Sequence, residues 1–397
     1  MSRFRQHVQD RLHALRSAGL LRDPVVGETP SGTHLVVGER RLLNLCSNNY
    51  LGLADDHRLR DRLVLASRRW GSATASRLIT GSLRPHRDAE RALAEFVGHA
   101  DARLFTSGYA ANVGAVSSLV GPDDLVLSDA LNHASLIDGC RLSRARTVVF
   151  PHRDLEALDS LLRAHRSSAR AALVVTDAVF SMDGDLAPLA GLREVADRHG
   201  AGLLVDEAHS LGVLGPSGTG LARALGVHVD VSTGMLGKAF GLSGGFVAAD
   251  ADTLRVLEST ARAYVFSTAM HSALADVIPD LVELVRTADP ARARLRAHRD
   301  VLAAALPRAR ATPEPHASIP ILPVLVGDAT RAVRVSAALA ERGVFVQAIR
   351  PPTVPAGTSR LRIVPIASHE DGDIAEAARI FRDVLGAAGL PIEEQAP

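Results

Sequence analysis

Residues 172–210, ALVVTDAVFSMDGDLAPLAGLREVADRHGAGLLVDEAHS, contain the pattern that decides the fold. Two short apolar runs, at residues 172–175 and 203–205, flank an amphipathic segment over residues 188–200. That segment ends in His199-Gly200, as helix C-termini commonly do. A strand, a helix and a second strand in succession are typical of parallel sheets, because a parallel connection must cross over the sheet. Residues 172–210 therefore predict a strand–helix–strand unit.

The same alternation extends over about residues 100–250. Further apolar runs lie at residues 125–127, 147–150, 229–231 and 245–247, and another helical pattern covers residues 154–166. Strands that alternate with helices predict an α/β fold with a mostly parallel central sheet flanked by helices.

The two ends of the chain have a different pattern. Apolar residues at helical spacing over residues 3–18 predict a helix packed on the protein surface, and residues 33–45 alternate like a hairpin. Residues 251–285 read as helical, and a smaller α+β unit follows. We therefore predict three parts: an N-terminal helix and hairpin segment (1–47), a large domain (48–287) and a small C-terminal domain (288–397).

Composition narrows the function classes. The 397 residues carry 45 basic and 44 acidic side chains, so no excess charge favours nucleic acid or a membrane surface. The sequence has no apolar run of membrane-spanning length and no signal-peptide core, which predicts a cytoplasmic protein. The two cysteines, Cys46 and Cys140, make neither a disulfide framework nor a zinc site, and we expect no metal.

Lys238 is the only lysine in the chain, although Lys and Arg together number 45. Arginine stays protonated, whereas a lysine amine can lose its proton and form a Schiff base with a carbonyl. Glycines surround Lys238 in TGMLGKAFGLSGG (233–245), as expected where the backbone approaches a ligand. The segment is not a nucleotide-binding P-loop, because Ala239 follows the Gly-Lys pair. We interpret Lys238 as a lysine of covalent catalysis.

Polar side chains follow the apolar runs of the predicted sheet. Asp206 and His209 come directly after residues 203–205, and residues 176–183 follow the run at 172–175. Ligands of parallel sheets bind beyond the carboxyl ends of the strands, so these side chains and Lys238 are expected to share a site. The letters DEAH at 206–209 also occur in helicases, but a helicase needs a phosphate-binding loop and a basic surface that this sequence lacks.

Two further segments have both a structural and a functional interpretation. Ser107-Gly108-Tyr109 opens a predicted helix, where backbone N–H groups hold phosphate, although Ser107 could equally be a simple N-cap. His133 lies between Asn132 and Ser135, which favours a site residue over a structural histidine.

Together these segments resemble the α-oxoamine synthases, a fold type I family that depends on pyridoxal 5′-phosphate (PLP). The resemblance covers about residues 10–390. The matching stretches are 47–53, 76–81, 107–112, 128–141, 179–188, 205–215, 234–245 and 346–362.

The resemblance implies a role for each matching residue. Lys238 would carry the cofactor as a Schiff base, Asp206 would pair with its ring nitrogen, His209 would contact its phenolic oxygen and His133 would stack on its ring; these four are the expected catalytic residues. Further cofactor contacts are implied for Ser107, Gly108, Tyr109, Ser181 and Thr268. Thr268 resembles a phosphate contact made to the partner subunit, which implies a homodimer with its active site at the subunit interface.

Substrate contacts are implied as well. Arg362 resembles the arginine that binds the amino-acid carboxylate, a bidentate task suited to guanidinium, and Asn48 lies where the family touches the same group. Arg22 and Thr353 fall where the biotin-pathway branch contacts its acyl chain, and Arg350 is a further expected substrate-binding residue.

The implied reaction is the decarboxylative condensation of an amino acid with an acyl thioester, giving an α-amino ketone. Residues 346–355, VQAIRPPTVP, are most similar to the biotin-pathway branch, which joins L-alanine to a pimeloyl thioester. Three alternatives stay open: a paralogue of a secondary-metabolite pathway, a glycine C-acetyltransferase, and a non-catalytic partner subunit. The last typically lacks the Schiff-base lysine.

Two segments depart from the family pattern. Met235 stands where the family usually has Ser or Thr against the phosphate, so either Thr233 supplies that hydroxyl or the chain is a specialised paralogue. Residues 71–77, GSATASR, are bulkier than the glycine-rich run of the biotin enzymes, which leaves the substrate pair open.

Overall fold

The computed structural model describes residues 2–30, 32–307 and 314–390. The chain forms two compact units. The large unit comprises residues 48–181 and 185–293, and the small unit comprises residues 1–47, 182–184 and 294–397. The boundary between them falls within helix α13 (Asp289–Ala303).

A seven-stranded sheet, counted over the described residues, forms the centre of the large unit, in the order β3-β9-β8-β7-β6-β4-β5. Only β9 runs antiparallel to its neighbours, so the prediction of a mostly parallel α/β sheet is confirmed. The strands are β3 (Asp101–Phe105), β4 (Leu125–Asp129), β5 (Arg146–Phe150), β6 (Ala172–Asp177), β7 (Gly202–Asp206), β8 (Val231–Met235) and β9 (Gly245–Ala249).

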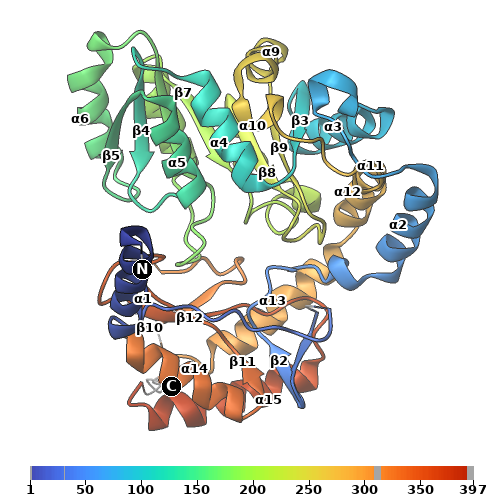
Figure 1. The fold of residues 1–397 in the computed structure, drawn as a ribbon, viewed down its shortest axis with the longest axis vertical. Helices are drawn as coiled ribbons and strands as arrows, with labels where there is room; N and C mark the ends of the chain where they lie inside the picture. Colours follow the sequence, from blue (N-terminus) through green and yellow to red (C-terminus); the bar gives the residue numbers. More distant parts are fainter. Residues whose placement is uncertain (1, 31, 308–313, 391–397) are drawn as a thin grey trace. The chain divides into compact units, whose positions relative to one another are not determined.

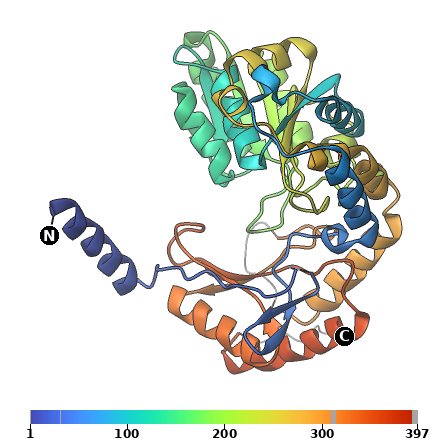
Figure 2. The same ribbon diagram turned by 45° about the vertical axis from the view of Figure 1, so that its right-hand side comes forward.

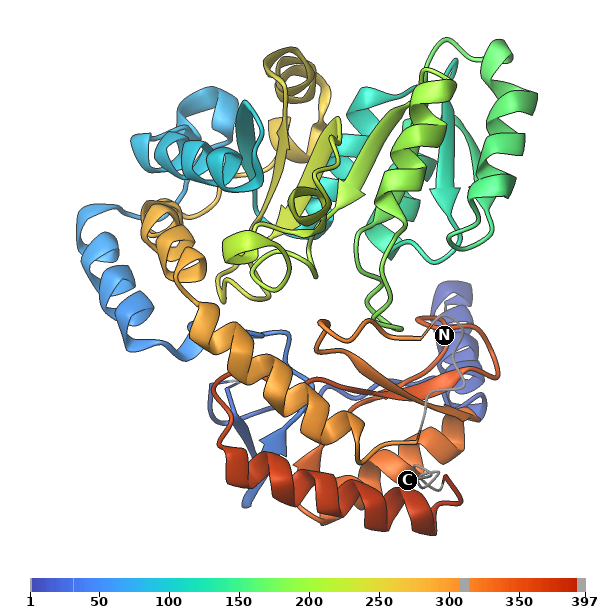
Figure 3. The same cartoon turned by 180° about the vertical axis from the view of Figure 1, so that it is seen from behind.

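Helices cover both faces of this sheet. Helices α4 (Gly108–Leu119) and α5 (Ala134–Ser143) lie on one face, and α7 (Leu189–Arg198) lies on the other (Figures 1 and 3). Val116, Leu136 and Leu204 belong to a continuous buried apolar cluster between α4, α5 and the strands. The remaining helices of the large unit are α2 (His57–Arg69), α3 (Arg84–Val97), α6 (Leu155–His165), α8 (Leu221–Leu225), α9 (Ala251–Thr260), α10 (Arg262–Val265), α11 (Ser272–Asp276) and α12 (Ile278–Arg286).

Strand β3 is absent from the sequence prediction because its residues, DARLF, include two charges. Arg103 is nevertheless buried, since it donates to Asp101 at 2.6 Å and to Glu258. These ion pairs allow a charged side chain inside the sheet.

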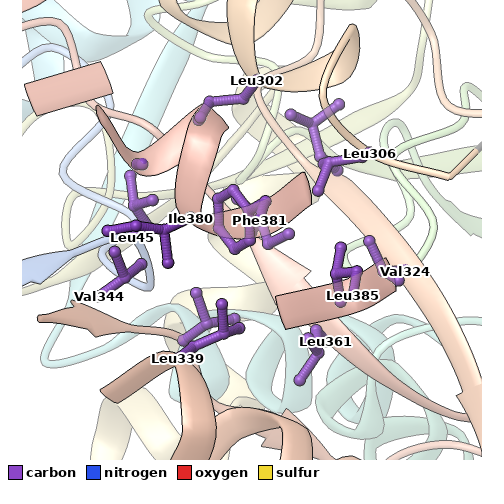
Figure 4. Close-up of a cluster of buried hydrophobic side chains, with 14 of the residues drawn as sticks. Leu45, Leu302, Leu306, Val324, Leu339, Val344, Leu361, Ile380, Phe381 and Leu385 are labelled. Carbon is purple, nitrogen blue, oxygen red and sulfur yellow. The ribbon is translucent and has the colours of Figure 1, made fainter. Parts of the chain in front are cut away.

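The small unit packs two three-stranded sheets, counted over its described residues, against helices. Its core includes Leu45, Val344, Leu361 and Phe381, which lie together in Figure 4. The elements are β1 (His34–Val37), β2 (Arg40–Asn44), β10 (Leu322–Gly327), α14 (Ala329–Glu341), β11 (Val344–Phe345), β12 (Ala348–Ile349), β13 (Ser359–Ile363) and α15 (Asp371–Ala387).

Helix α1 (Arg3–Ser17) forms where it was predicted, but it does not pack on the rest of the small unit. None of its residues is buried, the Phe4 side chain is 74% exposed, and Figure 2 shows the helix apart from the sheets of the small unit. Within the small unit, the prediction of a docked helix was therefore wrong. Among the described helices, none combines the length and the apolarity that a membrane crossing requires.

Candidate active site

The carboxyl ends of neighbouring strands bring the predicted acids together. Asp206 ends β7 and Asp177 ends β6, and the two residues are paired in register across the sheet. Lys238 follows the end of β8 by three residues, and its side chain is buried. Glycine is required nearby, because Gly241 has a φ of +66° and an added Cβ would lie 2.3 Å from the backbone nitrogen of Ala54.

Asp206 is held by hydrogen bonds to both carboxylate oxygens. Its Oδ1 accepts from the Ala208 backbone N–H at 2.8 Å, and its Oδ2 accepts from Asn112 Nδ2 at 2.6 Å. The side chain is 6% exposed. A carboxylate held in this way is oriented to pair with a protonated ring nitrogen.

His133 caps the N-terminus of α5 and is fixed from two sides. Its backbone N–H donates to Asp177 Oδ2 at 2.6 Å, and its Nδ1 lies 2.6 Å from Ser135 Oγ. Burial lowers the pKa of the imidazole, while the charge of Asp206 raises it and that of Lys238 lowers it. The structure therefore brings His133, Asp206 and Lys238 within electrostatic reach of one another.

Asp177 itself is buried. Burial, followed by the negative charge of Asp206, raises the pKa of Asp177 well above its usual value, although the bond from the His133 backbone opposes this. Asp177 therefore favours the neutral carboxyl form.

His209 is buried and contacts a second buried aromatic side chain. Its Nδ1 lies 2.6 Å from the Tyr50 hydroxyl, and Tyr50 is 0% exposed. The same hydroxyl lies 3.4 Å from Asn48 Oδ1, so one phenol links two predicted site residues. Sequence reasoning did not assign Tyr50 a role.

The N-terminus of α4 forms the predicted anion site. Ser107 caps the helix by accepting from the Ala110 N–H at 3.1 Å, which leaves its hydroxyl proton for another acceptor. Gly108 lies against β9, because a Cβ on Gly245 would come within 2.6 Å of its backbone nitrogen. Met235 packs beside Gly108, since a Cβ on Gly108 would lie 2.6 Å from Met235 Cε.

Thr233 was the candidate to supply the phosphate-binding hydroxyl that Met235 lacks, but its hydroxyl is bonded to another residue. Thr233 Oγ1 donates to Asn112 Oδ1 at 2.5 Å and is 1% exposed. Its proton is therefore not available to a phosphate in this arrangement.

The remaining predicted cofactor contacts lie on the large unit. Tyr109 is partly exposed and its hydroxyl donates to Asp138. Ser181 is half-buried in the turn after β6, and Thr268 is exposed and paired with Ser76 by a single β-bridge. Their cofactor roles stay predictions.

Four predicted substrate residues lie in the small unit, where three of them form one cluster. Arg22 Nη2 donates to Thr353 Oγ1 at 3.1 Å, and Arg350 donates to the Gly19 carbonyl at 2.5 Å. Arg362 is buried on β13. Arg22 and Thr353 are 331 positions apart, so the fold pairs two residues that the resemblance had assigned to one acyl chain.

These residues suit PLP as a ligand. A buried amine (Lys238) can hold an aldehyde, a hydrogen-bonded carboxylate (Asp206) can hold a protonated ring nitrogen, and glycine at the start of α4 leaves backbone N–H groups for a phosphate.

Asn112 is the main site residue that was not predicted from the sequence. Its signal was one amide side chain within the otherwise small and apolar stretch AANVGAV, residues 110–116.

Comparison with known proteins agrees with this arrangement. The family model for aminotransferase class I and II matches residues 40–381. The 8-amino-7-oxononanoate synthase of Anaeromyxobacter sp. (strain K) is 49% identical over 380 residues, covering 94% of this chain and 95% of that protein.

Solved structures of related enzymes are also similar to this chain. The serine palmitoyltransferase of S. paucimobilis with a bound PLP–myriocin aldimine has a TM-score of 0.89 and 32% identity, and the match covers 96% of this chain and 98% of that one. The 8-amino-7-oxononanoate synthase of Francisella tularensis has a TM-score of 0.74 and 25% identity, over 87% of this chain and 98% of that one. The chain is a PLP-dependent acyltransferase and belongs to the aminotransferase class I and II family as a fold type I α-oxoamine synthase.

Proposed function

We propose that the chain condenses L-alanine with a pimeloyl thioester, carried by CoA or by a carrier protein, to give 8-amino-7-oxononanoate in biotin biosynthesis. Carbon dioxide and the free thiol are the other products. The observation that carries the proposal is 49% identity, over nearly the whole chain, to enzymes named for this product.

The large-unit residues divide the work among themselves. PLP, when bound, supplies an electron sink for the charge that develops at the amino acid's Cα. Lys238 would hold the cofactor covalently and, once displaced, would take the Cα proton with its amine. Asp206 would keep a proton on the ring nitrogen, His133 would cover the ring face, and His209 would donate to the phenolic oxygen.

Recognition of the substrates is assigned to other residues. Arg362 offers a planar guanidinium suited to bidentate binding of the alanine carboxylate, with Asn48 as a second contact. The acyl chain would be bound by three residues that lie together in the small unit, Arg22, Arg350 and Thr353. Thr268 is exposed, as a residue that reaches the cofactor phosphate of a partner subunit must be, and we propose a homodimer on this basis.

The test is thiol release by the purified, PLP-loaded protein with pimeloyl-CoA and each of alanine, glycine and serine. Release that depends on alanine and greatly exceeds that with the other two supports the proposal. The matched control is Lys238→Arg, which keeps the positive charge but has no amine to give up a proton, and it should release no thiol above background. Equal rates in Lys238→Arg and the native protein would refute the assignment.

A second candidate is an α-oxoamine synthase with a different amino acid or acyl thioester. Two observations favour it: Met235 packs at the predicted phosphate site, and the TM-score to serine palmitoyltransferase, 0.89, exceeds the 0.74 to the synthase from F. tularensis. Serine with palmitoyl-CoA is therefore the second substrate pair to assay. Release with that pair, and none with alanine and pimeloyl-CoA, would select this candidate.

A further inference from the structure

Asn112, on α4, is the centre of a buried hydrogen-bond chain that the roles given above do not use. Its Nδ2 lies 2.6 Å from Asp206 Oδ2 and 2.8 Å from Ser135 Oγ. Its Oδ1 lies 2.5 Å from Thr233 Oγ1. Ser135 Oγ in turn lies 2.6 Å from His133 Nδ1. One amide thus connects the two residues assigned to the ring nitrogen and to the ring face.

The chemistry of these groups determines which atom donates in each hydrogen bond. A carboxylate only accepts, so the Asn112 atom facing Asp206 must be the amide nitrogen, and the oxygen must face Thr233. The Thr233 hydroxyl must then donate to Asn112. Ser135 Oγ accepts from Asn112 and has its own proton for His133 Nδ1.

The last bond of the chain determines the protonation of His133. Its Nδ1 accepts from the Ser135 hydroxyl and lies 3.2 Å from the Ser135 backbone N–H, a second donor. A nitrogen that accepts carries no proton, so the neutral imidazole holds its proton on Nε2.

Each hydrogen bond in this network depends on its protein partner, because the residues are buried. Asn112, Ser135 and Thr233 are at most 3% exposed, so water cannot replace a lost partner. Asp206 Oδ1 is already used by the Ala208 N–H, and Asn112 is the side chain that holds Oδ2.

We propose that Asn112 is a positioning residue that holds Asp206 and, through Ser135, His133 in one arrangement, and that Thr233 fixes the orientation of its amide. The inference rests on the proposed cofactor site around Lys238. It predicts that Thr233, which is assigned no contact with cofactor or substrate, affects cofactor binding through Asn112.

The experiment compares Asn112→Ala, Thr233→Val, Thr233→Ser and the double variant Asn112→Ala/Thr233→Val. The readouts are the PLP dissociation constant, from titration of the apoprotein, and the pH midpoint of the bound cofactor's absorbance change. Loss of a charge-assisted bond should weaken PLP binding at least about tenfold in Asn112→Ala. Thr233→Val should weaken it in the same direction and shift the midpoint, and Thr233→Ser should restore native values. The double variant should be no weaker than Asn112→Ala, because Thr233 acts through that amide.

Ser232→Ala is the matched control. Ser232 is the neighbouring buried residue on β8, and its hydroxyl lies 2.9 Å from His99 Nε2, so the control removes a comparable bond from the opposite face of the sheet. It should lower the unfolding temperature of the apoprotein without changing PLP binding.

Two results would overturn the inference: native PLP binding in both Asn112→Ala and Thr233→Val, or weakening of the same size in Ser232→Ala. If Asn112→Ala does not fold, the comparison of Thr233→Val with Thr233→Ser decides alone. Failure of the native protein to bind PLP at Lys238 would instead refute the proposed function.

Discussion

Replacing Tyr50 by Phe removes one hydroxyl and keeps the buried ring. That hydroxyl lies 2.6 Å from His209 Nδ1 in a fully buried environment. For neutral His209 to donate from Nε2 to a ligand oxygen, its Nδ1 must accept, and Tyr50 is the donor in position to supply that bond. A buried group that loses its partner costs about 1–3 kcal/mol. At about 1.4 kcal/mol per factor of ten, kcat/KM should fall roughly 5- to 150-fold.

The assay is thiol release with alanine and pimeloyl-CoA, with the unfolding temperature of the apoprotein measured in parallel. Tyr264→Phe is the matched control, because Tyr264 is also a buried tyrosine of the large unit and packs against Phe105. Tyr264 is assigned no contact with cofactor or substrate, so this variant should keep kcat/KM within about twofold of the native value. A Tyr50→Phe variant with native kcat/KM and native PLP affinity would refute the positioning of His209 by Tyr50.

Two further predictions concern pH and packing. Burial lowers the pKa of His152, but its hydrogen bonds with Asp129 and Asp185, both at 2.9 Å, raise it to about 9. Because the pKa of His152 in the folded protein lies above the ordinary 6.5, its protonation stabilises the fold fully below pH 6.5, and this stabilisation is lost as pH rises through about 9. The unfolding free energy of the native protein should therefore fall between pH 6.5 and 9, and His152→Gln should flatten that fall. An unchanged pH profile in His152→Gln would contradict the assignment. Gly245→Ala should weaken PLP binding more than Gly108→Ala, because the new Cβ meets backbone atoms of Gly108 in the first case and the movable Met235 side chain in the second. Titration of both apoproteins checks this order, and equal affinities would contradict it.

The sequence predicts the parts of the fold that rest on local patterns. The apolar runs at residues 125–127, 147–150, 172–175, 203–205 and 245–247 all lie in strands of the large sheet. The run at 229–231 overlaps β8 only at Val231, because Ser232, Thr233 and Gly234 interrupt the apolar pattern over the rest of that strand. Strand β3 is hidden for a similar reason, since its Arg103 is buried through ion pairs that sequence alone does not show.

The same limit applies to the site. Lys238 stands out because it is the only lysine, and Asp206 because an acid ends an apolar strand. Tyr50 and Asn112 could not be found in this way: Tyr50 meets His209 across 159 positions, and Asn112 meets Asp206 across 94. Pairings over such separations are set by the topology of the sheet, which a local pattern does not encode. Helix α1 shows the opposite kind of error. Its amphipathic pattern predicts that its apolar side chains are buried, but in the structure they are exposed.

The most direct test of the account is the site of covalent PLP attachment. The protein is mixed with PLP, reduced with borohydride and digested, and the modified peptide is identified by mass. The account predicts a single phosphopyridoxyl group on Lys238 of the native protein and none in Lys238→Arg, and no other lysine can substitute because the chain has no other. A native protein without this modification, or a Lys238→Arg variant that carries as much, would contradict the central claim.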